Sequence, residues 1–218
     1  MDGILVINKP KEWTSFDVVA KIRNKLGVKK VGHTGTLDPM ATGVLVLCLG
    51  KATKLAQEMT GYDKEYVAEI TLGATTPTDD AEGEITPFPG AKEKEIDEIA
   101  TALKDFEGEI MQLPPQFSAK KIKGKRAYAM ARKGQKVELK PVEVKVNELE
   151  LLNYKWPIIK LRVLSGKGFY VRSLARDLGE KLGTGGYLSA LQRTKVGKYD
   201  LSQATTIEEA DEKMVQAI

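Results

Sequence analysis

Two hydrophobic periods alternate along the chain, the two-residue period of a strand and the 3.6-residue period of a helix. Residues 3–10 form a short apolar run that ends at a proline, which predicts a buried strand. Residues 13–27 predict a helix that begins at the capping-box pair Thr14 and Asp17 and ends at Gly27. The apolar positions of this helix recur at helical spacing: Val18, Val19, Ile22 and Leu26.

The same periods continue through the rest of the chain. Further strands are expected at residues 43–53, 65–73, 142–154, 158–165, 169–171 and 194–199. Further helices are expected at residues 93–106, 172–183 and 187–192, and a short helix that ends at Gly134 follows a proline-anchored loop starting at residue 113. Strands joined by tight loops, with helices between them, indicate an α+β fold. We expect a mixed, mostly antiparallel sheet flanked by helices.

Spacing also predicts the buried faces of two of these elements. Residues 65–73 alternate, which predicts a half-buried strand with Tyr66, Ala68, Ile70 and Leu72 on one side. Residues 93–106 place apolar side chains on one helical face: Ile96, Ile99, Ala100, Leu103 and Phe106. Each element is therefore expected to turn one side toward a core.

Composition limits the class of protein. The chain has 218 residues, 42% of them hydrophobic, which suits one sizeable domain with a packed core. Its one cysteine, Cys48, lies in an apolar run, which excludes a disulfide framework and fits a reducing, cytoplasmic compartment. The N-terminus has an acid where a signal peptide needs a base, and no apolar run reaches the length of a membrane helix.

The net charge of +4 is unevenly distributed. Residues 118–136 carry eight basic residues and no acid, whereas residues 84–109 carry eight acids against three bases. A basic segment in a nearly balanced chain indicates a polyanionic partner, and the alternative is a solvated lysine-rich face.

The stretch GHTGTLDPMATGVL at residues 32–45 combines the only histidine, His33, with three glycines and Asp38. Pro39 biases Asp38 toward extended geometry, so the backbone holds its carboxylate in place. Such an aspartate is a nucleophile, a base, a metal ligand or the former of an Asx turn, and the last is the commonest. A metal role is disfavoured, because no second carboxylate or histidine stands nearby at ligand spacing, and the stretch lacks the lysine of a phosphate-binding loop.

This stretch closely resembles the signature turn of the TruB family of pseudouridine synthases, enzymes that modify tRNA. Further segments match the family in order: INKP with TSFDVV, KEYVAEITLGATTPTDDAEG, PPQFSAKKIKGKRAYAMARKG, SGKGFYVRSLARDLGEKLG and LQRTKVG. Together they cover residues 4–197, nearly the whole chain. The resemblance implies a pseudouridine synthase fold with a central active-site cleft. It also implies isomerisation of uridine to pseudouridine at position 55, in the TΨC loop of the tRNA T-arm.

Asp38 matches the catalytic aspartate of the family. The reaction breaks the bond between the ribose and N1 of uracil and rejoins the ribose at C5, without redox change. A carboxylate suffices for this chemistry, so neither a cofactor nor a metal is expected. Whether Asp38 attacks the sugar, attacks the base or removes a sugar proton stays open.

Five further residues match substrate-site positions of the family. Tyr66 matches the tyrosine that stacks on the flipped base, and Arg172 matches the arginine that pairs with the catalytic aspartate. Tyr170, Leu191 and His33 match a substrate-site tyrosine, a leucine of the uracil pocket and a histidine that enters the tRNA loop. Without the resemblance, Tyr66 and Leu191 would be core residues. His33 would be structural, and Arg172 would be an exposed residue at a helix start.

Basic residues complete the predicted site. Lys9 and Pro10 match the KP pair of the family, whose expected role is to support the catalytic turn. Lys167 lies between two glycines, where it can approach a phosphate. The basic run is expected to bind tRNA phosphates through Lys120, Lys121, Lys123, Lys125 and Arg126.

The chain departs from the family pattern in two places. Glu12 occupies a position where the family usually has glycine, so the local turn is expected to differ. About twenty residues follow the last matching segment, too few for the RNA-binding PUA domain that many members carry at the C-terminus. We therefore expect residues 1–218 to form a single catalytic domain that recognises mainly the T-arm.

We expect a cytoplasmic monomer that needs no protein partner and does not bind membranes. Two alternatives stay open. One is a synthase that acts on another RNA, alone or with a guide RNA and partner proteins. The other is a tRNA-binding or folding chaperone with dispensable catalysis. The fate of an Asp38 variant separates catalysis from binding, because binding alone needs no carboxylate that faces an anionic ligand.

Overall fold

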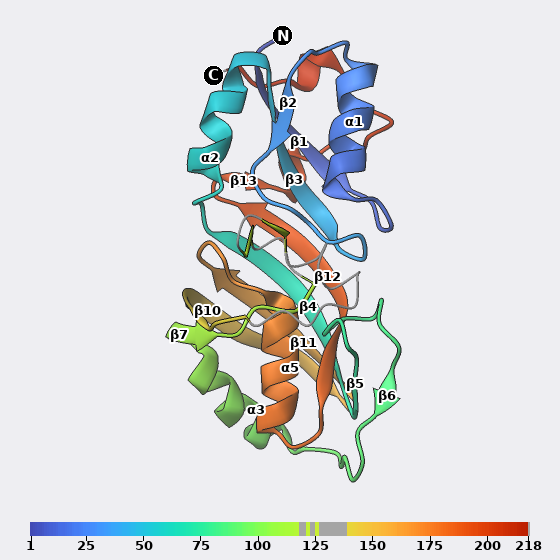
Figure 1. Ribbon diagram of the computed structural model, residues 1–218, viewed down its shortest axis with the longest axis vertical. Coiled ribbons are helices and arrows are strands. Elements are labelled where there is room, and N and C mark those ends of the chain that lie inside the picture. Colours follow the sequence, from blue (N-terminus) through green and yellow to red (C-terminus); the bar gives the residue numbers. More distant parts are fainter. Residues whose placement is uncertain (118–120, 123–124, 127–138, 218) are drawn as a thin grey trace. The chain divides into compact units, whose positions relative to one another are not determined.

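The computed structural model describes residues 1–117, 121–122, 125–126 and 139–217 (Figure 1). The chain forms two compact units. Unit 1 comprises Met1–Val67 and Ala190–Ile218, and unit 2 comprises Ala68–Ser189. Strands β4 (Lys64–Leu72) and β12 (Gly186–Val196), which pair with each other, each contain a boundary between the units.

Unit 1 is built on strands β1 (Gly3–Lys9) and β3 (Thr42–Leu49), which pair antiparallel along their length. Two further strands join β3: β2 (Val31–His33) is antiparallel to it, and β12 is parallel to it. Strand β13 (Tyr199–Asp200) pairs antiparallel with the end of β12. The predicted mixed, mostly antiparallel sheet is confirmed.

Both faces of β1 and β3 are apolar, and unit 1 buries both. One face packs on helix α1 (Ser15–Lys25), in a core that includes Leu5, Ile7, Val18, Ile22, Leu45 and Leu47. The other packs on the turn η1 (Gly50–Leu55) and helix α2 (Ala56–Met59), in a core that includes Ile4, Val6, Val44, Val46, Cys48 and Met59. Figure 1 shows α1 and α2 on opposite sides of these strands.

Helix α1 begins at the predicted capping box. The Asp17 N–H donates to Thr14 Oγ1 at 3.1 Å, and the Thr14 N–H donates to Asp17 Oδ2 at 3.0 Å. This arrangement satisfies two backbone donors at the start of the helix. It also fixes where the chain leaves the loop after β1.

The C-terminal segment of unit 1 runs along the open edge of β1. Thr205 forms a bridge with Ile7, and Gln216 forms one with Ile4. The short turns η3 (Leu201–Gln203) and η4 (Glu212–Met214) belong to this segment. It covers backbone groups that an edge strand would otherwise leave unpaired.

Unit 2 carries the strand order β4, β11 (Ile158–Ser165), β10 (Val142–Lys155) and β7 (Gly108–Gln112). Strand β10 pairs antiparallel with β11 and with β7, so the meander predicted for residues 142–165 is confirmed. Helices α3 (Ile96–Leu103) and α5 (Val171–Lys181) contact each other, and α3 also contacts β10. Among the described residues, none of the helices has the length and apolar character needed to span a bilayer.

Short elements complete unit 2. Strand β5 (Ala74–Thr75) pairs with β6 (Thr86–Pro87), and β8 (Lys121–Ile122) pairs with β9 (Lys125–Arg126). The turn η2 (Lys104–Phe106) continues α3. The helix predicted to end at Gly134 lies outside the described residues.

Two predicted elements are wrong. Residues 187–192 form part of strand β12 instead of a helix, although their leucines, alanine and glutamine favour a helix. Pairing with β3 and β4 overrides this local preference, because strand formation depends on the neighbouring strands. Residues 169–171 do not form the predicted strand, since Tyr170 is the N-cap residue of α5 and Val171 begins that helix.

One strand boundary and one helix face also differ from the prediction. The strand predicted at 43–53 ends at Leu49, because Gly50 has a left-handed φ of 59° that turns the chain into η1. The buried residues of α3 are Ile99, Ala102 and Leu103. Ile96, which was expected on this face, is 54% exposed, because the helix begins there and its first turn projects beyond the core.

Candidate active site

Asp38 lies in the turn between β2 and β3, and other parts of unit 1 hold the backbone on both sides of it. Each carbonyl from residue 35 to residue 39 accepts a hydrogen bond. The donors are, in chain order, Arg193 Nη2 at 3.1 Å, Arg193 Nη1 at 3.4 Å, Ser15 Oγ at 3.1 Å, Ala41 N at 3.0 Å and Glu12 N at 2.8 Å. The turn is therefore fixed by its surroundings, which orients Asp38 before any substrate binds.

Ser15, the first residue of α1, holds Leu37 through both main-chain groups. Its hydroxyl donates to the Leu37 carbonyl at 3.1 Å and accepts from the Leu37 N–H at 2.8 Å. Ser15 is 2% exposed, so these bonds lie in a nearly dry environment, where hydrogen bonds are strengthened. Helix α1 thus fixes the residue directly before Asp38.

Lys9, the last residue of β1, holds the other side of the turn. Its side chain is fully buried, and Nζ donates to the carbonyls of Pro10 at 2.8 Å, Trp13 at 2.6 Å and Pro39 at 3.3 Å. Glu12, in the same loop, has a φ of 70°, a left-handed conformation that favours glycine. The family usually has glycine at this position, and Glu12 adopts a backbone conformation that is typical of glycine. The supporting role of Lys9 and Pro10 stays a prediction.

Arg193 of β12 is a buried cation that the sequence did not single out. It is 2% exposed, and its Nε donates to the Val44 carbonyl at 2.8 Å, beside the bonds to residues 35 and 36. Burial lowers the pKa of Arg193, whereas interactions with the Tyr66 and Asp38 side chains raise that pKa. Arg193 thereby connects the turn, Tyr66 and Asp38.

Tyr66 and Lys64 lie on the buried face of β4, as the alternation of that strand predicts. Tyr66 is 9% exposed and Lys64 is 7% exposed. Lys64 Nζ donates to the carbonyls of Thr60 at 2.7 Å and Tyr62 at 2.6 Å. Burial, together with the charge of Arg193, lowers the pKa of Lys64 to about 8.

His33 contacts the turn, and Leu191 packs on the core of the same unit. His33 ends β2, and its Nδ1 accepts from the Gly35 N–H at 3.3 Å. Leu191 is half-buried on β12 and packs against the core cluster that contains Leu37. Both residues are thus placed in unit 1 with Asp38 and Tyr66.

Arg172 and Tyr170 lie in unit 2, at the start of α5. Arg172 Nη1 is 3.5 Å from Asp80 Oδ2, and both side chains are almost fully buried. Arg172 also donates to the carbonyls of Thr78 at 3.3 Å and Phe117 at 2.9 Å. This network fixes the guanidinium, and its pairing with Asp38 stays a prediction.

The backbone of Tyr170 is held by Gln112 of β7. The Tyr170 N–H donates to Gln112 Oε1 at 2.9 Å, and Gln112 Nε2 donates to the Tyr170 carbonyl at 3.0 Å. Tyr170 directly precedes helix α5 and Arg172 lies within it. The two side chains therefore do not share one face of a strand. Lys167 is exposed in the turn before α5.

The side chains of the predicted phosphate-binding run lie outside the described part of unit 2. Lys120 and Lys123 lie outside the described residues, and so do the side chains of Lys121, Lys125 and Arg126. Their expected contact with phosphates stays a prediction.

The structure adds four residues that the sequence analysis missed: Ser15, Lys64, Asp80 and Arg193. The burial of Lys64 could have been predicted, because Lys64 shares the two-residue period of the apolar face that contains Tyr66. Arg193 lies in the matching segment LQRTKVG, but the local sequence shows neither its burial nor its contact with the turn. Ser15 and Asp80 stand among polar residues of a cap and a loop, where local sequence does not show burial.

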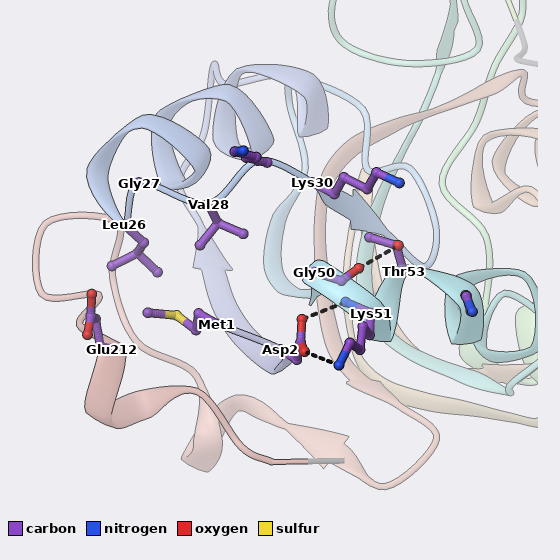
Figure 2. A pocket seen from close by; sticks show the side chains of 12 residues that line it. Met1, Asp2, Leu26, Gly27, Val28, Lys30, Gly50, Lys51, Thr53 and Glu212 are labelled. Atoms are coloured by element: carbon purple, nitrogen blue, oxygen red, sulfur yellow. Dashed lines mark hydrogen bonds and ion pairs between the residues drawn. The ribbon is translucent and has the colours of Figure 1, made fainter.

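An open pocket of about 860 Å³ lies elsewhere in unit 1 (Figure 2). Its lining includes the lysines Lys29, Lys30, Lys51 and Lys54 and the acids Asp2 and Glu212. Asp2 accepts from the Lys51 N–H at 2.8 Å and lies 3.6 Å from Lys51 Nζ. None of the lining residues belongs to the turn at 35–39, so this basic pocket is separate from the candidate active site.

Comparison with known sequences identifies relatives over nearly the whole chain. A family model described as TruB family pseudouridylate synthase (N terminal domain) matches residues 23–171, and one described as tRNA pseudouridylate synthase B C-terminal domain matches residues 172–217. A curated protein of Parabacteroides distasonis named tRNA pseudouridine synthase B is 48% identical. The match covers 99% of this chain and 94% of that protein.

Two solved structures share the fold. A chain of the "Crystal Structure of a Cbf5-Nop10-Gar1 Complex" is 32% identical with a TM-score of 0.76, covering 95% of this chain and 53% of that one. A chain of the "Structure of H/ACA RNP bound to a substrate RNA containing 2'-deoxyuridine" is 30% identical with a TM-score of 0.71, covering 95% and 51%. With its pseudouridine synthase fold and these sequence matches, the chain belongs to the TruB family of pseudouridylate synthases.

Proposed function

We propose that this protein isomerises uridine to pseudouridine at position 55, in the T-loop of tRNA. The observation that carries the proposal is the turn of Asp38, whose flanking carbonyls are all held by hydrogen bonds. A carboxylate on such a turn is oriented in advance, which is what a catalytic group requires. The relative named tRNA pseudouridine synthase B, matched over 94% of its length, supports tRNA as the substrate.

The reaction conserves the atoms of the nucleotide apart from a proton exchange. The bond between C1′ of the ribose and N1 of uracil breaks, the base turns, and C1′ forms a bond with C5. The hydrogen on C5 leaves as a proton, and N1 gains one. Asp38 acts as nucleophile on the sugar or the base, or as the base that removes a sugar proton, and each role needs its ionised form.

The target base must leave its stack to reach Asp38, which costs a few kcal/mol. Tyr66, on the same face of β4 as Lys64, supplies an aromatic ring that replaces the lost stacking. We assign Leu191 to the apolar wall of the uracil pocket and His33, which contacts Gly35 of the turn, to the tRNA loop contact. Tyr170 and Arg172 are proposed to bind the substrate as well.

Binding of tRNA rests on its phosphates, which makes the affinity dependent on salt. Two basic regions support this part of the proposal: the run at residues 118–136 and the pocket lined by four lysines. We place the protein in the cytoplasm as a monomer that needs no partner. The buried, unpaired thiol of Cys48 fits that reducing compartment.

A second candidate is action on another RNA within a larger assembly. It draws support from the structural match to chains of complexes whose titles name further proteins or an H/ACA RNP. The higher identity to the tRNA synthase, 48% against 32%, favours the stand-alone enzyme.

The test is tritium release from a tRNA transcript labelled at C5 of uridine, with the wild type and Asp38→Asn side by side. We expect release by the wild type alone, with the product mapped to the T-loop uridine, and equal tRNA binding by both proteins. Release that maps to another position or needs another RNA would favour the second candidate. Binding without release by either protein would leave a tRNA-binding protein with dispensable catalysis.

A further inference from the structure

Arg193 carries a buried positive charge close to the turn of Asp38. It is 2% exposed, and the hydrogen bonds that it donates to residues 35, 36 and 44 all end on neutral carbonyls. A buried guanidinium loses much of its solvation free energy, and carbonyls restore only a part of it. The charge is therefore best compensated by a nearby anion.

Gly43 makes room for the backbone of Arg193, and Gly35 lies next to its guanidinium. A side chain at Gly43, where φ is 102°, would collide with the carbonyl of Arg193. A methyl group at Gly35 would lie 3.6 Å from Arg193 Nη1, in direct contact with the guanidinium. The segment that carries Asp38 and the Arg193 side chain thus fit closely together.

Two groups of the candidate site interact with this guanidinium. The Tyr66 and Asp38 side chains both favour the charged guanidinium electrostatically. One buried group on β12 therefore interacts with a residue of β4 and with the carboxylate of the turn.

We propose that Arg193 is a positioning residue for the isomerisation: it holds the backbone before Asp38 in one geometry, and its charge favours the ionised carboxylate. It acts through the turn, without contact with the substrate. The inference rests on the proposed function, because the reaction defines what must be positioned.

Other charged groups lie near the same turn and stay unchanged in the test. Lys9 on β1 donates to the Pro39 carbonyl, His33 on β2 accepts from Gly35, and Lys64 on β4 lies beside Arg193. Differences among Arg193 variants therefore report on the guanidinium itself.

The first experiment compares Arg193→Met and Arg193→Lys with the wild type, using single-turnover rates and the Kd for tRNA. Below the melting transition, we expect Arg193→Met to lower the rate about 100-fold, while the Kd changes less than about threefold. Arg193→Lys, which keeps the charge, should recover at least about tenfold of that rate. The acidic limb of the pH–rate profile should move to higher pH in Arg193→Met, because a carboxylate ionises less readily without the cation.

Met59→Ala is the matched control. Met59 is 3% exposed in the core beside α2, so its truncation destabilises unit 1 without touching the turn. Its rate per folded molecule should stay within about threefold of the wild type. If Arg193→Met also keeps its rate and pH profile, or if Arg193→Lys is no better than Arg193→Met, the proposal is wrong.

A second experiment stays valid if Arg193→Met does not fold, and it needs no tRNA. The Nε–H resonance of Arg193 is identified by its loss in Arg193→Lys and then compared between the wild type and Asp38→Asn. We expect it to shift, because the charge that faces it is removed. An unmoved resonance would overturn the link to Asp38, whereas failure of the proposed function would show only as an inactive wild type.

Discussion

Lys9 and Arg193 lie in one row of the unit 1 sheet, one on each side of Gly43. In the strand register, Gly43 pairs with Lys9 of β1 and with Arg193 of β12. Residues opposite each other in neighbouring strands turn their side chains to the same face, and glycine contributes none. Two buried cations therefore flank an open position, and both reach the turn of Asp38, Lys9 after it and Arg193 before it.

This row explains why the chain combines glycines with an aspartate before a proline. Gly43 lets the backbone of β12 approach β3. The proline restricts Asp38, and the hydrogen bonds of the two cations fix the residues around it.

Ser15→Ala tests the contact between α1 and the turn. The substitution leaves the buried N–H and carbonyl of Leu37 without their partner, so it should lower the unfolding free energy by about 1–3 kcal/mol. The single-turnover rate should fall about tenfold, because the residue before Asp38 is no longer fixed. Urea unfolding and rapid-quench kinetics measure the two effects.

Thr14→Ala is the control for Ser15→Ala. It removes the N-cap of the same helix, which costs about 0.5–2 kcal/mol, but Thr14 makes its cap contacts within α1. Its rate should equal that of the wild type. Equal rate losses in both variants would show that helix stability, and not the contact with Leu37, controls the turn.

Glu12→Gly should stabilise the protein. Glu12 has a φ of 70°, which costs a residue with a Cβ roughly 1 kcal/mol or more, whereas glycine adopts it freely. Part of this gain is lost to the greater freedom of glycine in the unfolded chain, so a net gain of about 0.5–1 kcal/mol is expected. Thermal unfolding of Glu12→Ala, which keeps the strain, is the comparison, and a glycine variant less stable than the alanine variant contradicts the account.

Lys64 makes stability depend on pH. Its pKa is about 8 in the folded protein against 10.5 for an ordinary lysine, so the unfolded chain binds more protons between these values. The unfolding free energy should therefore rise as pH increases from about 8 toward 10.5, by up to about 3 kcal/mol. Lys64→Met should lack this rise. Urea unfolding at pH 7.5, 9 and 10 compares the two proteins, and parallel curves would refute the burial of a charged Lys64.

The lysine pocket of unit 1 should contribute to tRNA affinity without affecting chemistry. The double variant Lys29→Gln and Lys54→Gln should reduce the slope of log Kd against log salt by about 1 for each lost phosphate contact. The rate at saturating tRNA should stay unchanged. Lys181→Gln, which removes an exposed lysine paired with Asp105 in unit 2, serves as control. An unchanged slope in the double variant would exclude the pocket from the tRNA interface.

Local sequence patterns predicted the elements whose hydrophobic period is strong. Strand β4 and helix α1 follow from alternation and from the capping box, because both signals come from residues a few positions apart. The stretch around Asp38 identified the family through the combination of glycines, aspartate and proline. These features depend on neighbours along the chain, so the sequence displays them directly.

Strand pairing in the folded protein brings residues that are distant in the chain into contact with the turn of Asp38. Residues 187–192 have the local preference of a helix, and only pairing with β3 and β4 makes them a strand. The same pairing buries Arg193 beside Gly43, about 150 positions away in the chain. Hydrophobic period and helix or strand propensity depend on residues that are close together in the chain. The partner of a buried charge depends instead on which strands pair. For this reason the aspartate could be found from the sequence, and the arginine that holds its turn could not.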